Sequence, residues 1–329
     1  YQLIANVDEL RQRLLTRDFD LMLLSDYDAQ LFQYHAQRPF QKVKSWLSLV
    51  RIFRFRGMTG TMAHFKYLRA LPFSLAELNS FAPVIVVDLT DSPLLTPKDQ
   101  RVLRDCSLYF KREVPFDRLF LYYQDRPAPW TTRRKELLPI LEKVQNIPLG
   151  IEDAKYAALK QQRVTVQDID VLFVGEITNT LRKTGMEHLQ ELASNSQWNI
   201  VITRGLPFDE YCRMIARSKI TVSIAGGGWD CFRHYEAVAL GSLPLMNKPT
   251  IDAVWWHPMP EEIFFENTFV NFRSRIEQLL TNDSLRTSGF EQLEQQVEHR
   301  MLHSKIIEYI IKTSLEKLSC QTGSLSTTM

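Results

Sequence analysis

Cysteine is scarce in this sequence, and its spacing excludes two kinds of stabilised fold. The 329 residues contain four cysteines and no CxxC pair: Cys106, Cys212, Cys231 and Cys320. This pattern argues against a disulfide framework and a structural zinc site, and it favours a reducing compartment. Also missing are an N-terminal signal sequence and an apolar run of the roughly 18 to 20 residues that a membrane span needs. We expect a cytoplasmic chain, or a luminal one if it is a fragment of a larger membrane-anchored protein.

An excess of charge of one sign is missing too. Lys and Arg number 40 against 38 Asp and Glu, so the formal net charge is +2. Charge alone therefore gives no argument for a nucleic-acid partner, and we expect none. The hydrophobic share of 45% is normal for a globular protein, and the chain is long enough for two domains.

Two nucleotide-binding fingerprints are absent. The chain has neither the GxxxxGK[ST] loop that cradles phosphates nor the GxGxxG turn of dinucleotide sites. Any nucleotide site must therefore be built from another pattern.

The first half of the chain carries a helical pattern over residues 7–17 and then three buried-strand patterns, at residues 19–25, 83–89 and 107–111. Periodicity weakens over residues 117–168, where prolines and charges gather. We place the domain junction in that stretch and predict an N-terminal domain over residues 1–150.

Residues 42–71 are basic and aromatic. The near-helical spacing of their apolar residues favours helices whose Lys and Arg side chains reach out to water. A surface patch for a membrane or a nucleic acid is the other interpretation, and peripheral membrane contact through this segment is one of our expectations.

Strands and helices alternate in the second half. Strand patterns stand at residues 171–174, 198–203, 220–224, 242–245 and, more weakly, 268–272; helical patterns stand at residues 181–192, 208–217 and from 274 onward. This alternation indicates βαβ units and a parallel sheet. The predicted fold class is α/β with two Rossmann-like domains, the second over residues 151–329.

Three glycines, Gly226, Gly227 and Gly228, follow the predicted strand at residues 220–224 and precede a helical pattern. Ligands in parallel α/β sheets lie beyond the carboxyl ends of the strands. Glycine allows close backbone approach and positive φ, and a helix N-terminus attracts phosphate. Asp230 is the expected N-cap of this helix and Gly241 its expected C-terminal stop.

Arg233 and Glu236 are three residues apart on this helix, so their side chains share a face. The helical rise separates them by about 4–5 Å along the axis, which suits a phosphate and the adjoining sugar of a nucleotide. An arginine holds phosphate oxygens with a fixed fork of donors. An acidic side chain accepts from ribose hydroxyls. Together they predict a nucleoside diphosphate site, while a surface ion pair is the plainer interpretation.

The stretch from Ala216 to Pro249 resembles the nucleotide-sugar-binding segment of exostosin-like and related GT-B glycosyltransferases. The resemblance is carried by the glycine loop, Arg233, Glu236 and the run Gly241-Ser242-Leu243-Pro244-Leu245. It implies two domains facing across a cleft, with a nucleotide-sugar donor, UDP-sugar before others, held by the C-terminal domain. A glycan or other hydroxyl acceptor would bind the N-terminal domain, and polysaccharide biosynthesis would be the setting. No cofactor is implied.

The resemblance also implies donor contacts from Arg182. Arg204 and Arg233, near a strand end or a helix start, are further candidates to hold the diphosphate. His234 and Trp229 are candidates to touch the sugar or the base, with packing in the core as their alternative role.

Four aspartates follow predicted strands where a site could form: Asp26, Asp28, Asp88 and Asp91. Asp26, Asp28 and Asp91 are the candidate general bases, unranked, and a cap or turn role is the alternative for each. A DxD pair at a strand end is the usual metal-binding motif of the other glycosyltransferase fold. Asp168-Ile169-Asp170 has this spacing but precedes its strand, and Asp26-Tyr27-Asp28 follows a strand and matches better, yet the glycine-rich helix in the second half argues against that fold. We therefore expect no metal. A nucleotide-sugar isomerase and a non-catalytic binding or assembly module are the competing functions.

Overall fold

The computed structural model describes residues 7–32, 73–122 and 137–323. Contacts divide the chain into two units. The N-terminal unit comprises Tyr1–Leu89, Leu94–Lys111 and Asp117–Gln145; the C-terminal unit comprises Thr90–Pro93, Arg112–Phe116 and Asn146–Met329. Two short segments of the first half thus belong to the C-terminal unit. The basic and aromatic segment 42–71 lies outside the described residues.

The N-terminal unit is built on a sheet with strand order β1-β2-β3-β4, in which β1, β2 and β3 pair in parallel. The strands are β1 (Met22–Ser25), β2 (Val84–Asp88), β3 (Leu108–Lys111) and β4 (Val144–Asn146). Its helices are α1 (Val7–Leu15), α2 (Asp26–Phe32), α4 (Leu75–Phe81) and α5 (Pro97–Asp105), with a 3-10 turn, η1 (Arg118–Tyr122). Strand β2 is rich in valine and isoleucine and almost wholly buried, as a strand covered on both faces must be.

The C-terminal unit contains a five-stranded parallel sheet with order β6-β5-β7-β8-β9. The strands are β5 (Ile169–Val174), β6 (Ile200–Thr203), β7 (Ser218–Ser223), β8 (Leu243–Asn247) and β9 (Phe264–Phe265). Val171 pairs with Ile200 of β6 on one side and with Ile220 of β7 on the other. Strand β5 is therefore flanked on both sides.

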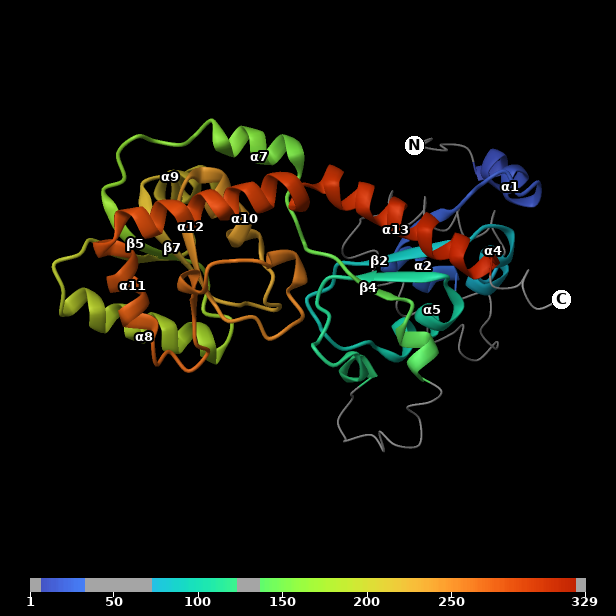
Figure 1. Ribbon diagram of the computed structural model, residues 1–329, viewed down its shortest axis with the longest axis horizontal. Helices are drawn as coiled ribbons and strands as arrows, with labels where there is room; N and C mark the ends of the chain where they lie inside the picture. The colour runs from blue at the N-terminus through green and yellow to red at the C-terminus, as the bar shows by residue number, and fades with distance from the viewer. Residues whose placement is uncertain (1–6, 33–72, 123–136, 324–329) are drawn as a thin grey trace. The chain divides into compact units, whose positions relative to one another are not determined.

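Helices cover both faces of this sheet. Figure 1 shows α8 (Thr180–Ser194) and α11 (Phe272–Thr281) on the face opposite α9 (Phe208–Ala216) and α10 (Phe232–Leu240). The remaining helices are α7 (Asp153–Lys160), α12 (Asp283–Gln296) and α13 (His303–Gly323), with a π-helical turn at Val297–Met301 and 3-10 turns at Val254–Trp256 and Glu261–Ile263. Chain order places the crossover after β5 on one face and the crossover after β7 on the other.

The α/β class and the parallel sheets predicted from the alternating pattern are confirmed. The predicted strand at residues 268–272 is wrong, because these residues form a turn that leads into α11, while the last strand is Phe264–Phe265. Gly241 ends α10 in the left-handed conformation (φ +88°), as expected for a glycine stop. Among the described helices, none is long and apolar enough to cross a membrane.

Candidate functional site

The strand order of the C-terminal unit defines where a ligand fits. The chain leaves β5 for β6 on one side and returns to β7 on the other, so the loops after β5 and β7 diverge to opposite faces of the sheet. Parallel sheets of this order bind ligands in the crevice beyond the carboxyl ends of those two strands. Gly175 opens one loop and Ile224 the other.

Asn179 joins the two loops. It is the N-cap of α8, and its side-chain oxygen accepts a hydrogen bond from the backbone N–H of Arg182 (2.9 Å). Its amide nitrogen donates to the carbonyls of Ala225 (3.0 Å) and Gly226 (2.9 Å) in the loop after β7.

Arg182, in the first turn of α8, bonds to the backbone of both loops. Its Nε donates to the Ile224 carbonyl (3.1 Å) and its Nη1 to the Glu176 carbonyl (3.1 Å). A Cβ on Gly226 would lie only 2.6 Å from Arg182 Nη2, so the arginine needs a glycine there. Burial, and then the nearby charge of Arg233, lower the pKa of Arg182.

Arg233, in the first turn of α10, lies against Gly175 at the end of β5. Its guanidinium lies over the Phe173 ring, with Cζ 5.8 Å from the centroid. A Cβ on Gly175 would lie 2.3 Å from Arg233 Nη2, so this side chain also depends on a glycine. Its Nε and Nη1 are fully buried and have no hydrogen-bond partner among the described residues.

Two guanidinium groups thus converge where the topology places a ligand. Within the described ranges, no ion pair joins Arg182 or Arg233 to a carboxylate. Buried charges are costly unless they are compensated. The arrangement is therefore suited to an anion with several oxygens, such as a diphosphate.

Glu236 lies one turn further along α10 and is buried. Its Oε1 accepts from Lys155 Nζ of α7 (2.6 Å) and its Oε2 from the Tyr211 hydroxyl of α9 (2.6 Å). The carboxylate therefore joins three helices, a structural role that the sequence did not indicate. Burial and the charge of Glu236 raise the pKa of Tyr211, and the charge of Arg233 opposes this rise. Arg233 and Glu236 therefore both act on the Tyr211 hydroxyl.

Aromatic side chains surround Lys155. Its Nζ lies 5.3 Å from the Phe208 ring and 5.5 Å from the Phe232 ring. Both phenylalanines are more than half exposed, at 52% and 55%. Phe208 also stacks on Tyr211, with centroids 6.0 Å apart. An exposed aromatic patch next to Glu236 is able to receive a flat ring.

Side chains from elsewhere in the C-terminal unit pack directly against the glycine loop. A Cβ on Gly227 would lie 2.9 Å from Asp91 Oδ2, and one on Gly228 would lie 2.5 Å from Glu113 Oε1. None of the three loop glycines has a positive φ. Close approach of carboxylates, and not backbone conformation, explains Gly227 and Gly228.

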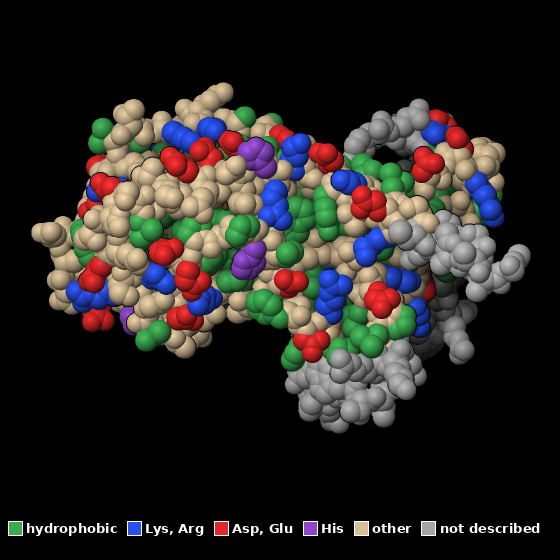
Figure 2. All heavy atoms as spheres, viewed as in Figure 1, with side chains coloured by type: hydrophobic (Ala, Val, Ile, Leu, Met, Phe, Trp, Pro, Cys, Tyr) green, Lys and Arg blue, Asp and Glu red, His purple; other side chains and the backbone are tan. Residues whose placement is uncertain are grey.

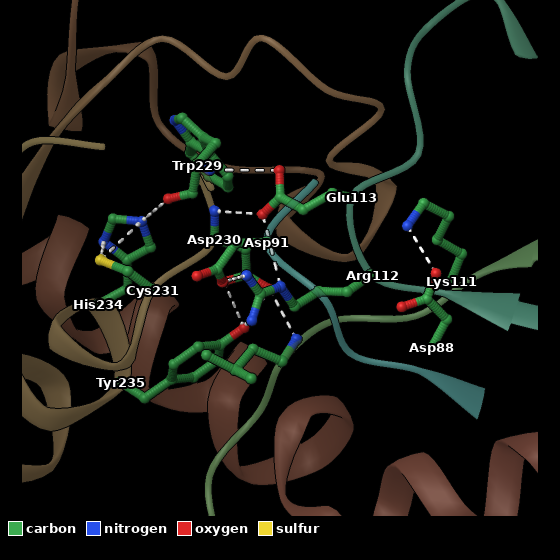
Figure 3. A network of polar contacts seen from close by, with 11 residues as sticks. Asp88, Asp91, Lys111, Arg112, Glu113, Trp229, Asp230, Cys231, His234 and Tyr235 are labelled. Carbon is green, nitrogen blue, oxygen red and sulfur yellow. Dashed lines mark hydrogen bonds and ion pairs between the residues drawn. The ribbon is translucent and has the colours of Figure 1, made fainter. Parts of the chain in front are cut away.

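Glu113 occupies backbone donors that we expected to hold phosphate. Its carboxylate accepts from the N–H groups of Trp229 (3.2 Å) and Asp230 (3.0 Å), as Figure 3 shows. Burial raises the pKa of Glu113 to about 7, against the opposing effect of these hydrogen bonds. The two backbone donors that immediately precede the N-cap of α10 are therefore occupied by Glu113.

Two predicted contact residues, Trp229 and His234, are buried in the core. Trp229 donates its indole N–H to the Asn247 carbonyl (2.7 Å), and His234 places Nε2 2.9 Å from the Trp229 carbonyl. Their packing role is the one the structure favours. The predicted N-cap Asp230 is wrong: Cys231 holds that position, and Asp230 instead accepts from the Tyr235 hydroxyl and the Leu149 N–H.

The remaining predicted residues of this unit lie on its surface. Arg204 follows β6 and is exposed. Asp91 is 66% exposed, pairs with Arg112, and lies against Gly227. Of the three candidate bases, Asp91 is the one that belongs to the same unit as the two arginines.

Asp26 and Asp28 belong to the N-terminal unit. Asp26 is buried directly after β1, where its carboxylate accepts from Tyr109 (3.1 Å) and Gln30 (2.8 Å). Burial, followed by the charges of Asp88 and Asp99, raises the pKa of Asp26 to about 7. Asp28 accepts from the Ser25 hydroxyl (2.6 Å) at the start of α2, which is a capping arrangement.

The same unit contains a buried ion pair at the ends of β2 and β3. Lys111 Nζ lies 2.7 Å from Asp88 Oδ2, and the Tyr109 hydroxyl also donates to this carboxylate (2.9 Å). Among the described residues, no group of three His, Cys, Asp or Glu side chains is placed to hold a metal ion.

Comparisons with known proteins give likeness of fold only. No protein-family model and no curated protein matches the chain. An α-glucosyltransferase in complex with UDP-glucose and DNA containing an abasic site is 13% identical over 96% of this chain and 84% of that one, with a TM-score of 0.49. Another α-glucosyltransferase complex, with UDP and a 13-mer DNA containing an A:G mismatch, is 13% identical over 77% and 75% (TM-score 0.48). Acinetobacter baumannii MurG is 9% identical over 89% and 99% (TM-score 0.39).

Identities and TM-scores this low carry no argument on activity, and the exostosin-like resemblance stays a prediction. Three of the similar structures contain DNA. This finding overturns our expectation of no nucleic-acid partner, which we withdraw. The expectation was weak physically, because a net charge averages over the chain; Figure 2 shows charges of both signs interspersed on the visible face of the C-terminal unit.

Proposed function

We propose that the chain is a glycosyltransferase that moves a sugar from a nucleoside diphosphate donor, a UDP-sugar before others, to a hydroxyl acceptor. One observation carries the proposal: Arg182 and Arg233 converge beyond β5 and β7 without a carboxylate partner among the described residues. The resemblance of the surrounding sequence to donor-binding segments supports the same conclusion.

The chemistry of the leaving group explains why two arginines suit this site. Transfer breaks the bond between the anomeric carbon and a phosphate oxygen, and negative charge then develops on the departing diphosphate. Fixed donors in a site that excludes water stabilise such charge without having to reorganise. Arg233 offers two buried unpaired donors for this purpose. Because the guanidinium groups supply the positive charge, we propose that turnover does not need a divalent metal.

The other end of α10 suits the nucleoside. A carboxylate has about four lone-pair positions, and Glu236 uses two of them for Lys155 and Tyr211. We propose that ribose hydroxyls use the remaining positions. The exposed rings of Phe208 and Phe232 offer a surface on which a base can stack.

Asp91 is our candidate for the general base. It is exposed and lies beside the glycine loop, which leaves its carboxylate accessible to an acceptor hydroxyl. In the proposed step the hydroxyl oxygen bonds to the anomeric carbon, its proton passes to Asp91, and the diphosphate leaves. Asp26 is less suited to this task because it is buried among its own hydrogen-bond partners.

A donor-consumption assay tests the proposal. The protein is incubated with a panel of nucleotide sugars, with and without EDTA, and products are followed by NMR. A transferase hydrolyses one donor slowly without acceptor, an isomerase interconverts donors, and a binding module leaves all of them unchanged. Arg233→Ala should abolish the reaction, whereas Arg213→Ala, on an exposed arginine of α9, should not. Absence of any donor turnover across the panel and a set of simple glycan acceptors would contradict the assignment.

A further inference from the structure

Cys231 differs from the other described cysteines in its surroundings. It is the N-cap of α10 and partly exposed, whereas Cys106 and Cys212 are buried. Its Sγ lies 3.5 Å from the Ser223 hydroxyl and 3.8 Å from both ring nitrogens of His234. A thiol, an imidazole and a hydroxyl therefore meet at the start of this helix.

The imidazole is held by a third group. His234 is fully buried, and its Nε2 lies 2.9 Å from the Trp229 carbonyl oxygen (Figure 3). A carbonyl only accepts, so the hydrogen-bond pattern assigns a proton to Nε2 and leaves Nδ1, also 3.8 Å from the sulfur, as the ring nitrogen that accepts from the thiol. A nucleophile beside a base that is itself oriented by a third group is the arrangement that activates cysteine in enzymes.

The electrostatics favour the thiolate. Burial opposes it, but the charge and hydrogen bond of His234, the charge of Arg233 and the hydrogen bond with Ser223 together lower the pKa of Cys231 to about 6. The helix N-terminus acts in the same direction. Burial, by contrast, raises the pKa of Cys106 to about 12 and that of Cys212 to about 11.

The sulfur also belongs to the environment of the two arginines. A charge on Cys231 raises the pKa of Arg182, and the charge of Arg233 lowers the pKa of Cys231. Three other ionisable groups face the start of this helix. The charge of Asp230 raises the pKa of His234, and a charge on Cys231 raises the pKa of Tyr211 and of Tyr235. A substituent on the sulfur would therefore enter the region that the diphosphate is proposed to occupy.

We infer that Cys231 is a nucleophilic thiolate and a site of covalent modification by soft electrophiles and hydroperoxides. Its modification blocks the neighbouring site formed by Arg182 and Arg233. With a hydroperoxide, the sulfur attacks one peroxide oxygen, the O–O bond breaks, and a sulfenic acid and an alkoxide or hydroxide form. The sulfur is oxidised by two electrons and the peroxide is reduced. The blocking effect rests on the proposed function, but the reactivity does not.

Alkylation by iodoacetamide of the native full chain, followed by peptide mass spectrometry from pH 5 to 9, tests the reactivity. Cys231 should react at least ten times faster than Cys106 and Cys212 at pH 7, with a midpoint near pH 6. His234→Gln should move that midpoint upward, and Arg233→Met should do so while the contact between Cys231 and His234 stays in place. A midpoint near pH 8.5, as for an ordinary thiol, or a rate as slow as that of the two buried cysteines would overturn the inference.

Protection by ligand separates this inference from the proposed function. Saturating UDP should slow alkylation of Cys231 at least tenfold, and the alkylated protein should lose UDP binding by calorimetry. Fast alkylation without protection would support the thiolate and overturn the blocking effect. A sulfenic acid trapped by dimedone on the Cys231 peptide after peroxide treatment, absent in Cys231→Ser, would support the oxidative reaction; failure to trap it would overturn that part.

Discussion

Replacing Arg233 by methionine should change ligand-free stability and ligand binding in opposite directions. The substitution removes two buried donors without partners and a like charge that acts on Arg182. An unsatisfied buried donor costs about 1–3 kcal/mol. Methionine keeps much of the packing on Phe173, although it loses the cation–π contact. We expect the variant to be more stable than wild type by about 1–2 kcal/mol when no ligand is present.

The same change removes charged hydrogen bonds to the proposed diphosphate, each worth about 1.5–3 kcal/mol, so UDP affinity should fall about 10- to 150-fold. At 100 times the wild-type Kd, UDP stabilises wild type by about 2.7 kcal/mol, but a variant weakened 100-fold gains only about 0.4 kcal/mol. The order of stability should therefore reverse on adding UDP.

Urea unfolding with and without UDP measures this reversal, and Arg213→Met serves as the control, because Arg213 is exposed on α9. A methionine variant that is less stable than wild type without ligand, yet equally stabilised by UDP, would refute the reasoning. Arg233 would then be a structural residue.

The other predictions concern three further residues. Glu236→Gln should weaken UDP binding by about 1–3 kcal/mol while circular dichroism shows a retained fold; an unchanged calorimetric affinity would reject the ribose contact. The pKa of Asp26 is about 7 in the folded protein and 3.8 in the unfolded chain. Protonated Asp26 therefore contributes up to about 4 kcal/mol to the free energy of unfolding below pH 4, and this contribution is lost as pH rises through 7. Urea unfolding from pH 4 to 8 should show this decline, and Asp26→Asn should flatten it; identical profiles would exclude Asp26 as its source. Gly228→Ala should cost about 1–3 kcal/mol, because its Cβ would meet the Glu113 carboxylate; equal losses in the Glu113→Ala background would show that this contact is not the cause.

The strand and helix pattern of the C-terminal unit could be predicted from sequence because buried parallel strands and amphipathic helices have distinct periodicities. The short strand β4 (Val144–Asn146) could not, because three residues carry no periodic signal. Helix α7 was missed for a similar reason: it lies in a region where prolines and charges dilute the pattern.

The site was predictable only where its residues are close in sequence. Arg233 and Glu236 share a helix face, and spacing alone places them together. Glu113 contacts Trp229 and Asp230 across more than a hundred residues, and no local pattern announces such a contact. Burial is a further limit, since sequence does not show which way a tryptophan or histidine points at the start of a helix.

Asn179 has a consequence for how tightly a ligand can be held. One amide caps α8 and also ties the loop after β5 to the loop after β7. The two loops are thus held together before any ligand binds, so binding does not have to order them and loses no affinity to that entropy cost. Ligand affinity should therefore depend on Asn179 even if this side chain does not contact the ligand. Asn179→Ala should loosen the two loops and weaken binding although Arg182 and Arg233 are both still present.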